Sequence, residues 1–158
     1  MKSIILETSR RQRIANGQID DISQFEARSA SSLRQKYSQA RWRTNRLNPT
    51  YNCHGMTFAS RRTSVFDSAD IHKILTDDNY AEVPRRDATP GDIVLYFSDD
   101  GDIEHSGIVV SDPEPDLGIP KICSKWGRAF EVIHWANDCP YDSSNMHFYR
   151  PQNAISTK

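Results

Sequence analysis

Two side chains that can act together in nucleophilic chemistry, Cys53 and His105, stand 52 positions apart. A thiol attacks as its thiolate, and the start of a helix or a neighbouring imidazole lowers the pKa of a cysteine. Cys53 follows a turn-forming stretch and opens the helix-like segment "CHGMTFA". His105 opens "HSGIVV", a segment rich in β-branched residues that is typical of a strand. The pattern predicts a cysteine nucleophile on a helix that packs against a strand carrying its general base.

Two other roles stay open for Cys53, a buried structural thiol or a metal ligand beside His54. A zinc site needs three or four Cys, His or carboxylate ligands, and the chain contains no C-x-x-C or H-x-x-x-H pair. We therefore expect neither a metal nor a cofactor. His54 is expected to line the rim of a pocket or to face solvent, and Asn52 is expected at the same pocket.

The elements that must position these residues begin with helices. Ser23 and Glu26 form the S-x-x-E capping box, which predicts a helix start. Apolar residues then recur at helical spacing at Phe25, Leu33, Tyr37 and Ala40. A second helix is expected from about Cys53 to Arg62, and a third, short one over residues 67–79.

After the turn "ATPGD" the hydrophobic period changes from helical to strand-like. Asp-Gly in "SDDGD" predicts a hairpin between the first two strands. Five strands are expected, over "DIVLYF", "HSGIVVS", "PKICSKWG", "AFEVIHW" and "MHFYR". Helices followed by an antiparallel meander predict an α+β fold, with the nucleophile helix packed on the sheet.

Three stretches resemble the signatures of NlpC-like papain-fold cysteine peptidases and amidases, including the related CHAP amidases. These are "YNCHGMTFA", "TPGDIVLYF" and "HSGIVV", in the family's order. The gaps match as well, with 37 positions from Cys53 to Pro90 and 15 from Pro90 to His105. The resemblance covers roughly residues 48–135. Within that range, "SKWGRAFEVIHW" is similar to the Ser-Lys-hydrophobic-Gly, acidic-x-x-His pattern of some NlpC-like domains.

The resemblance implies a papain-like NlpC-type domain with Cys53 as nucleophile and His105 as base. It also implies a third residue that orients the imidazole from a following strand. A hairpin between "HSGIVV" and "IPKICSKW" places His105 opposite Ser124, and a shift of one or two residues places it opposite one of the next two positions. Ser124 is the first choice, with Glu131 and His134 on the next strand as alternatives.

The implied activity is cleavage of an amide bond in a peptide or peptidoglycan stem peptide through a thioester, with acyl transfer or deamidation as variants. The backbone N–H of Cys53 is expected to help hold the oxyanion. The family's usual Asp and Ser around the nucleophile are Asn52 and His54 here, which bears on the substrate subsite rather than on the fold. A small domain of this kind suits a bacterial effector or toxin, or a phage- or plasmid-encoded protein.

Charge divides the chain into a basic and an acidic part. Residues 1–50 carry 10 Lys and Arg against 4 Asp and Glu, whereas residues 51–158 carry 10 against 17. We therefore expect a basic helical extension at 1–47 and a catalytic domain at 48–158. The alternative function is a non-catalytic papain-fold module whose basic arm binds an acidic protein or nucleic acid. Nucleic acid is the less favoured partner, because no aromatic residues interleave with the arginines as in nucleic-acid-binding motifs.

The remaining expectations concern location and the other thiols. No apolar run approaches the ~20 residues of a membrane span, and the N-terminus lacks a signal-peptide pattern. A cytoplasmic protein is expected, with export by a signal-independent route left open. Three cysteines leave at least one reduced thiol, with Cys123 facing the core and Cys139 exposed in a loop.

Overall fold

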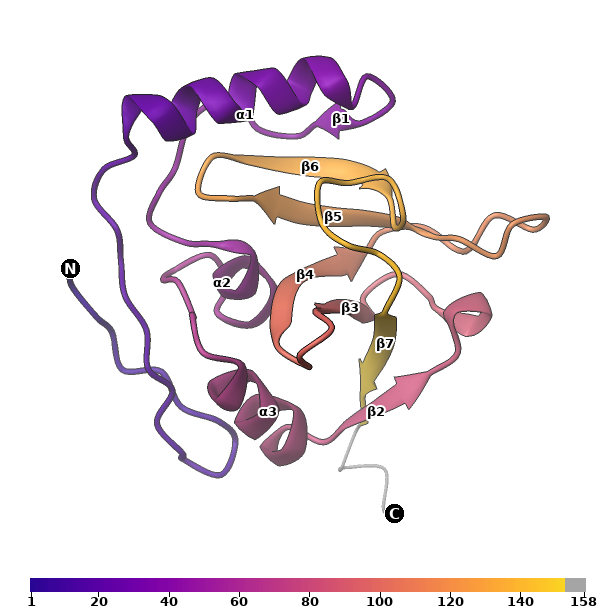
Figure 1. Ribbon diagram of the computed structural model, residues 1–158. Helices are drawn as coiled ribbons and strands as arrows, with labels where there is room; N and C mark the ends of the chain where they lie inside the picture. Colours follow the sequence, from indigo (N-terminus) through magenta and orange to yellow (C-terminus); the bar gives the residue numbers. More distant parts are fainter. Residues whose placement is uncertain (153–158) are drawn as a thin grey trace.

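The computed structural model describes residues 1–152, and within them a seven-stranded antiparallel sheet is flanked by helices (Figure 1). The strand order is β1-β6-β5-β4-β3-β7-β2. The helices are α1 (Gln24–Lys36), α2 (Cys53–Phe58), α3 (Ser68–Asp77) and the 3₁₀ turn η1 (Arg85–Asp87). The strands are β1 (Arg41–Trp42), β2 (Tyr80–Val83), β3 (Ile93–Phe97), β4 (Ile103–Val109), β5 (Lys121–Trp126), β6 (Phe130–Trp135) and β7 (Met146–Pro151).

The α+β class and the five expected strands are confirmed. Strands β3 to β6 follow one another as antiparallel neighbours, which is the expected meander. Strand β7 returns to pair with the free side of β3, and β2 forms the edge beyond it. The sequence pattern missed β1 and β2, because strands of two and four residues are too short to show a period.

Helix boundaries follow local capping chemistry. The Ser23 hydroxyl accepts a hydrogen bond from the Glu26 N–H at 3.1 Å, so α1 begins where the capping box predicts. Helix α2 ends at Phe58, four residues earlier than expected. Ser60 and Arg61 have φ angles of 52° and 64°, so the backbone leaves the right-handed helical region there.

Successive side chains along each strand point to opposite faces of the sheet, so the hydrophobic core is divided between the two faces. On β3, Ile93 and Leu95 pack with α3, while Val94 and Tyr96 pack into a second cluster that contains Trp126. Helix α2 covers a third, smaller cluster built around Met56, Tyr51 and Cys123. Leu33 of α1 and Tyr37, the residue that caps the end of this helix, pack against the Trp126 cluster. The sheet is therefore covered on both faces.

Residues 1–47 share this sheet and this core. Strand β1 pairs with β6, and isolated bridges hold the first residues to one another and to Ser64. Leu6 and Ile14 are buried beside α3, where the N-terminal chain loops past that helix (Figure 1). Of the expected 48–158 domain, residues 153–158 lie outside the described residues. None of the described helices is both long and apolar enough to cross a membrane.

Candidate active site

Asn52 sets the position of Cys53, the first residue of α2. The Asn52 side-chain oxygen accepts hydrogen bonds from the N–H groups of Gly55 and Val65, at 2.9 and 3.2 Å. Its amide nitrogen donates to the Val65 carbonyl at 2.8 Å. One side chain therefore caps the helix and ties it to the segment that follows. Cys53 is buried, with 8% of its surface exposed.

Gly55 allows that following segment to lie against α2. A Cβ atom at this position would stand 1.8 Å from the Thr63 carbonyl oxygen, which no side chain can tolerate. The glycine after the Cys-His pair is therefore required by close backbone packing rather than by chemistry at the thiol.

His105 lies on β4 and is completely buried. It is the third residue of the strand and not the first, because β4 already begins at Ile103. Its ring stacks on Tyr141, with 3.6 Å between ring centroids and 7° between planes. Among residues 1–152, neither ring nitrogen has a hydrogen-bond partner of regular geometry. Two unpartnered buried nitrogens are costly unless they serve a reaction or a ligand.

The thiol of Cys53 lies within the influence of two imidazoles. Burial alone would raise its pKa, but the nearby positive charges and N–H groups of His54 and His105 lower the pKa well below its ordinary value. The structure thus brings Cys53 and His105 together as the spacing predicts. Their contact is loose rather than a regular hydrogen bond, which is common in active sites without substrate.

The pairing of β4 with β5 explains how the thiol reaches this strand. That ladder runs from Gly107, opposite Ser124, to Val109. At the level of His105 the two strands are not paired, so the start of α2 can approach the imidazole. If the β4–β5 register is extended by two residues, His105 lies level with Trp126. This differs by two residues from the register that places His105 opposite Ser124, and two residues is the larger of the shifts considered from the sequence.

His54 lies in a different environment from the one expected. It is neither on a rim nor in solvent, because only 4% of its surface is exposed. Its Nδ1 lies 2.8 Å from the Ser106 hydroxyl, and its Nε2 lies 3.3 Å from the Ile103 carbonyl oxygen. Helix α2 turns this side chain onto β4, so His54 belongs to the site. No local sequence signal distinguishes such a buried histidine from an exposed one.

Ser124 and His134 contact each other rather than a ring nitrogen of His105. The Ser124 hydroxyl lies 2.7 Å from His134 Nε2 and accepts a hydrogen bond from the Trp126 indole. His134 Nδ1 lies 2.7 Å from the Trp135 carbonyl, which can only accept, so Nε2 is the acceptor for Ser124. Burial, with a smaller contribution from the charge of His105, lowers the pKa of His134 to about 3. His134 is therefore a neutral, structural neighbour of the site.

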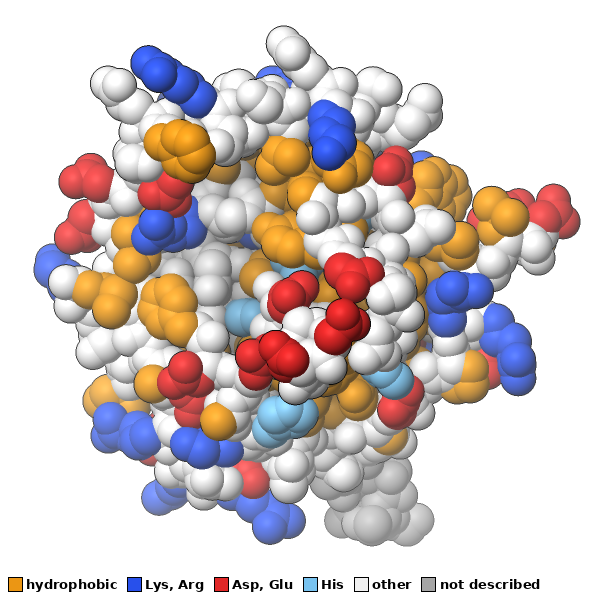
Figure 2. All heavy atoms as spheres, in the orientation of Figure 1, with side chains coloured by type: hydrophobic (Ala, Val, Ile, Leu, Met, Phe, Trp, Pro, Cys, Tyr) orange, Lys and Arg blue, Asp and Glu red, His pale blue; other side chains and the backbone are white. Residues whose placement is uncertain are grey.

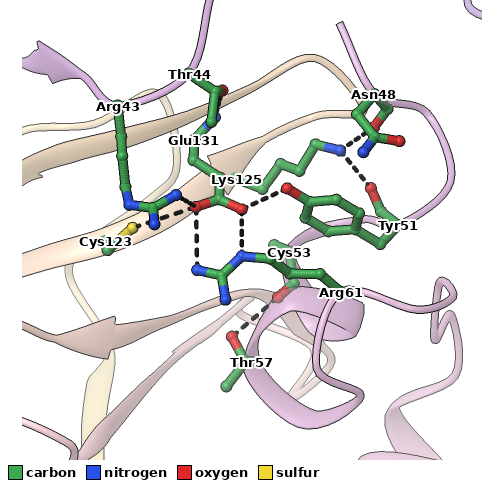
Figure 3. A network of polar contacts seen from close by, with 10 residues as sticks. All are labelled: Arg43, Thr44, Asn48, Tyr51, Cys53, Thr57, Arg61, Cys123, Lys125 and Glu131. Atoms are coloured by element: carbon green, nitrogen blue, oxygen red, sulfur yellow. Dashed lines mark hydrogen bonds and ion pairs between the residues drawn. The ribbon is translucent and has the colours of Figure 1, made fainter. Parts of the chain in front are cut away.

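Glu131 anchors the chain on both sides of the nucleophile (Figure 3). Its carboxylate accepts hydrogen bonds from the Tyr51 hydroxyl, from Arg61 Nε at 2.6 Å and from Arg43 at 2.8 Å. Burial would raise the pKa of Glu131, but hydrogen bonds from Arg61 and Tyr51 and the charges of Arg61 and Arg43 lower it. Tyr51 precedes Cys53 by two residues and Arg61 follows α2, so Glu131 holds the nucleophile segment rather than the imidazole.

Lys125 is a second buried charge that the sequence did not single out. Its ammonium donates to the backbone carbonyls of Asn48 and Tyr51 and lies 3.5 Å from the centroid of the Tyr51 ring (Figure 3). Burial lowers its pKa to about 8, and the charges of Glu131 and Cys53 act in the opposite direction. Lys125 therefore fixes the loop that leads into α2 and adds positive charge near the thiol.

Tyr141 also went unnoticed in the sequence, because it lies in the irregular segment between β6 and β7. Its hydroxyl accepts a hydrogen bond from the Gly127 N–H at 2.9 Å, and its ring covers the imidazole of His105. This contact depends on how the chain returns to the sheet, which no local pattern encodes.

The other two cysteines are free and buried. Cys123 faces the α2 side of the sheet, and burial and the charge of Glu131 raise its pKa to about 11. Cys139 was expected at the surface, but only 8% of it is exposed and burial raises its pKa. Within residues 1–152, no group of three or more His, Cys, Asp or Glu side chains is arranged to hold a metal ion.

No protein-family model, curated protein or solved structure matches this chain.

Proposed function

We propose that this protein is a cysteine hydrolase that cleaves an amide bond through a thioester intermediate. The observation that carries the proposal is the buried Cys53 thiol at the start of α2, beside His105, whose two buried ring nitrogens have no hydrogen-bond partner among residues 1–152. His54 and His105 together lower the pKa of this thiol well below its ordinary value, which supports the same reading. Structural buried cysteines behave in the opposite way, as Cys123 and Cys139 do in this chain. A thiolate held in place at neutral pH is a nucleophile.

His105 is the general acid and base, because its ring nitrogens are not engaged elsewhere in the described chain. The Cys53 thiolate attacks the carbonyl carbon of the substrate, and the tetrahedral intermediate collapses to a thioester as His105 protonates the departing amine. Water then attacks the thioester while His105 takes its proton, and the acid product leaves with Cys53 again a thiolate and His105 again protonated. Stacking on Tyr141 keeps the imidazole plane fixed through these steps.

The finer fold that fits this chemistry is papain-like of the NlpC type. A nucleophile helix followed by an antiparallel meander, with the base on the second strand of the meander, supports it. The substrate class proposed with that resemblance is a peptide or a peptidoglycan stem peptide. Deamidation and acyl transfer use the same thioester, with ammonia as the leaving group or an amine in place of water.

The Tyr141 ring lies against the imidazole of His105. Cys53 is nearly covered and His105 fully covered, and we propose that the Tyr141 ring moves aside when a substrate binds. A cavity of about 220 Å³ lies next to this ring, between α1 and the end of β5 at Trp126. Its walls are mainly apolar, so a substrate side chain docked there would be apolar.

Alkylation with iodoacetamide tests the nucleophile. The three cysteines have similar exposed fractions, 8% for Cys53, 5% for Cys123 and 8% for Cys139, so differences in rate report thiolate content rather than access. At pH 7 we expect Cys53 to be labelled at least tenfold faster than the other two, measured by peptide mass mapping. Equal labelling of Cys53 and Cys139 would sink the proposal.

Hydrolysis is tested with purified peptidoglycan fragments and with a mixture of peptides, scored by the release of new amino groups. We expect Cys53→Ala to abolish release, with the folded state checked by circular dichroism. Cys139→Ala is the matched control and should retain release. Release that persists in Cys53→Ala contradicts the assignment of the nucleophile.

A further inference from the structure

A chain of hydroxyl groups connects α2 to β4 beside the thiol. The Thr57 hydroxyl donates to the Cys53 carbonyl at 2.9 Å, one turn back along the helix. The Ser106 hydroxyl donates to the Thr57 oxygen at 3.0 Å. Each hydroxyl has a single proton, so in this arrangement both protons are already committed.

His54 therefore meets two groups that can only accept. When the Ser106 proton points to Thr57, the Ser106 oxygen, 2.8 Å from Nδ1, presents only lone pairs to the ring, and the contact then requires a proton on Nδ1. The Ile103 carbonyl, 3.3 Å away, accepts from Nε2, so Nε2 carries a proton as well. A histidine with protons on both nitrogens is an imidazolium, and its charge is buried, because only 4% of the His54 surface is exposed.

The negative group that balances this charge is Cys53. Burial would lower the pKa of His54, but the charge of the Cys53 thiolate and the hydrogen bond to Ile103 raise it above its ordinary value. The other ionisable groups facing the thiol are His105 on β4, Lys125 on β5 and Tyr141 before β7. The Lys125 ammonium is held by two carbonyls, and burial and the Cys53 charge raise the pKa of Tyr141, so Tyr141 stays neutral.

We propose that His54 is a permanent imidazolium that holds Cys53 as a thiolate, acting as a positioning residue distinct from the general acid and base His105. This deepens the proposed cysteine chemistry and rests on it. His105 must give its proton to the leaving amine and take one back from water. With His54 charged throughout, the thiolate keeps a positive neighbour while His105 is neutral.

The test is the pH dependence of Cys53 alkylation by iodoacetamide in the full-length protein, quantified by mass spectrometry. Removing a charge next to an ionisable group shifts its titration by about 1 to 3 pH units. In His54→Gln, which keeps donor capacity without the charge, we expect the alkylation midpoint to rise by that amount. His72→Gln, an exposed histidine of α3, is the matched control and should leave the midpoint unchanged.

Ser106→Ala keeps the test decisive if His54→Gln does not fold. It removes the acceptor for Nδ1 and leaves the ring in place, so we expect a smaller rise of the Cys53 midpoint. Nitrogen-15 NMR of the His54 ring at pH 7 adds an independent signature, with both nitrogens protonated.

The outcomes separate the two proposals. A low alkylation midpoint in the unmodified protein that neither variant moves, or a neutral His54 ring, overturns the inference and leaves the hydrolase standing. An ordinary midpoint near 8.5, the usual value for a free cysteine, overturns the proposed function itself.

Discussion

Glu131 shows how one buried side chain secures the site from a distance. Its carboxylate is only 1% exposed and receives hydrogen bonds from Tyr51, Arg61 and Arg43. The two arginines are 41% and 49% exposed, so solvent screens part of their attraction. Removing the carboxylate would leave the Tyr51 hydroxyl and both guanidinium groups without this hydrogen-bond acceptor.

Glu131→Gln should lower the free energy of unfolding by about 3 kcal/mol, at the low end of the range for breaking a buried ion pair because the arginines reach solvent. Urea unfolding followed by circular dichroism measures this. Glu104→Gln, an exposed carboxylate of β4, should stay within about 0.5 kcal/mol of the unmodified protein. Equal stability of the two variants would contradict the role of Glu131.

The pH dependence of that stability has a definite sign. The folded-state pKa of Glu131 is lowered, so its contribution is fully present above the unfolded-state pKa of about 4.3 and is lost as pH falls through the folded value. The stability difference between the unmodified protein and Glu131→Gln should therefore shrink on acidification below about pH 4.

At the scale of elements, α2 is a six-residue helix whose placement depends on its cap and on the loop behind it. Asn52 accepts two N–H groups and also donates to the Val65 carbonyl. An aspartate, which NlpC-like enzymes usually have before the nucleophile, could accept but not donate. Asparagine thus caps the helix without adding a negative charge next to the thiolate.

Asn52→Asp should raise the midpoint of Cys53 alkylation by about one pH unit, because a carboxylate disfavours a neighbouring thiolate. The lost hydrogen bond to Val65 should also lower the free energy of unfolding by about 1 kcal/mol. Both are measured on the same protein, by the alkylation profile and by urea unfolding. An unchanged alkylation midpoint would show that the charge at this position does not act on Cys53.

At the scale of the whole molecule, the N-terminal residues are part of the folded body. Arg43 reaches Glu131, so part of the charge difference between the two halves is used in an internal contact. Glu26 pairs with Arg128 at 2.8 Å and ties α1 to the body as well. On the face shown in Figure 2, acidic side chains gather near the turn between β3 and β4, while Lys and Arg lie dispersed around the edge. That face offers no continuous basic surface.

Ile14→Ala should lower the free energy of unfolding by about 2 to 4 kcal/mol, because it leaves a cavity beside α3. Ile14 is 3% exposed, whereas Ile5 is 68% exposed on the same segment. Ile5→Ala is therefore the matched control, with an expected change within about 0.5 kcal/mol. Chemical denaturation of both variants checks this, and equal stabilities would mean that residues 1–21 are not integral to the fold.

Local patterns were sufficient for much of the fold. The capping box at Ser23, the α3 segment and the five longer strands follow from side-chain chemistry and hydrophobic period within a few residues, and the structure confirms them. The sequence spacing also pointed to Cys53 and His105 as partners. These features depend on residues close together in the sequence or on the order of motifs, and both can be read from the sequence without a structure.

Tertiary structure alone decided the surroundings of the thiol. The two-residue difference in the β4–β5 register, the Tyr141 stack on His105 and the Glu131 anchor all join residues far apart in the chain. The burial of His54 belongs with them, although His54 stands next to Cys53 in the sequence, because only the packing of α2 on β4 removes it from water. The order and spacing of the motifs indicate which residues react. The ionisation of those residues depends on long-range packing and on the charges buried by it.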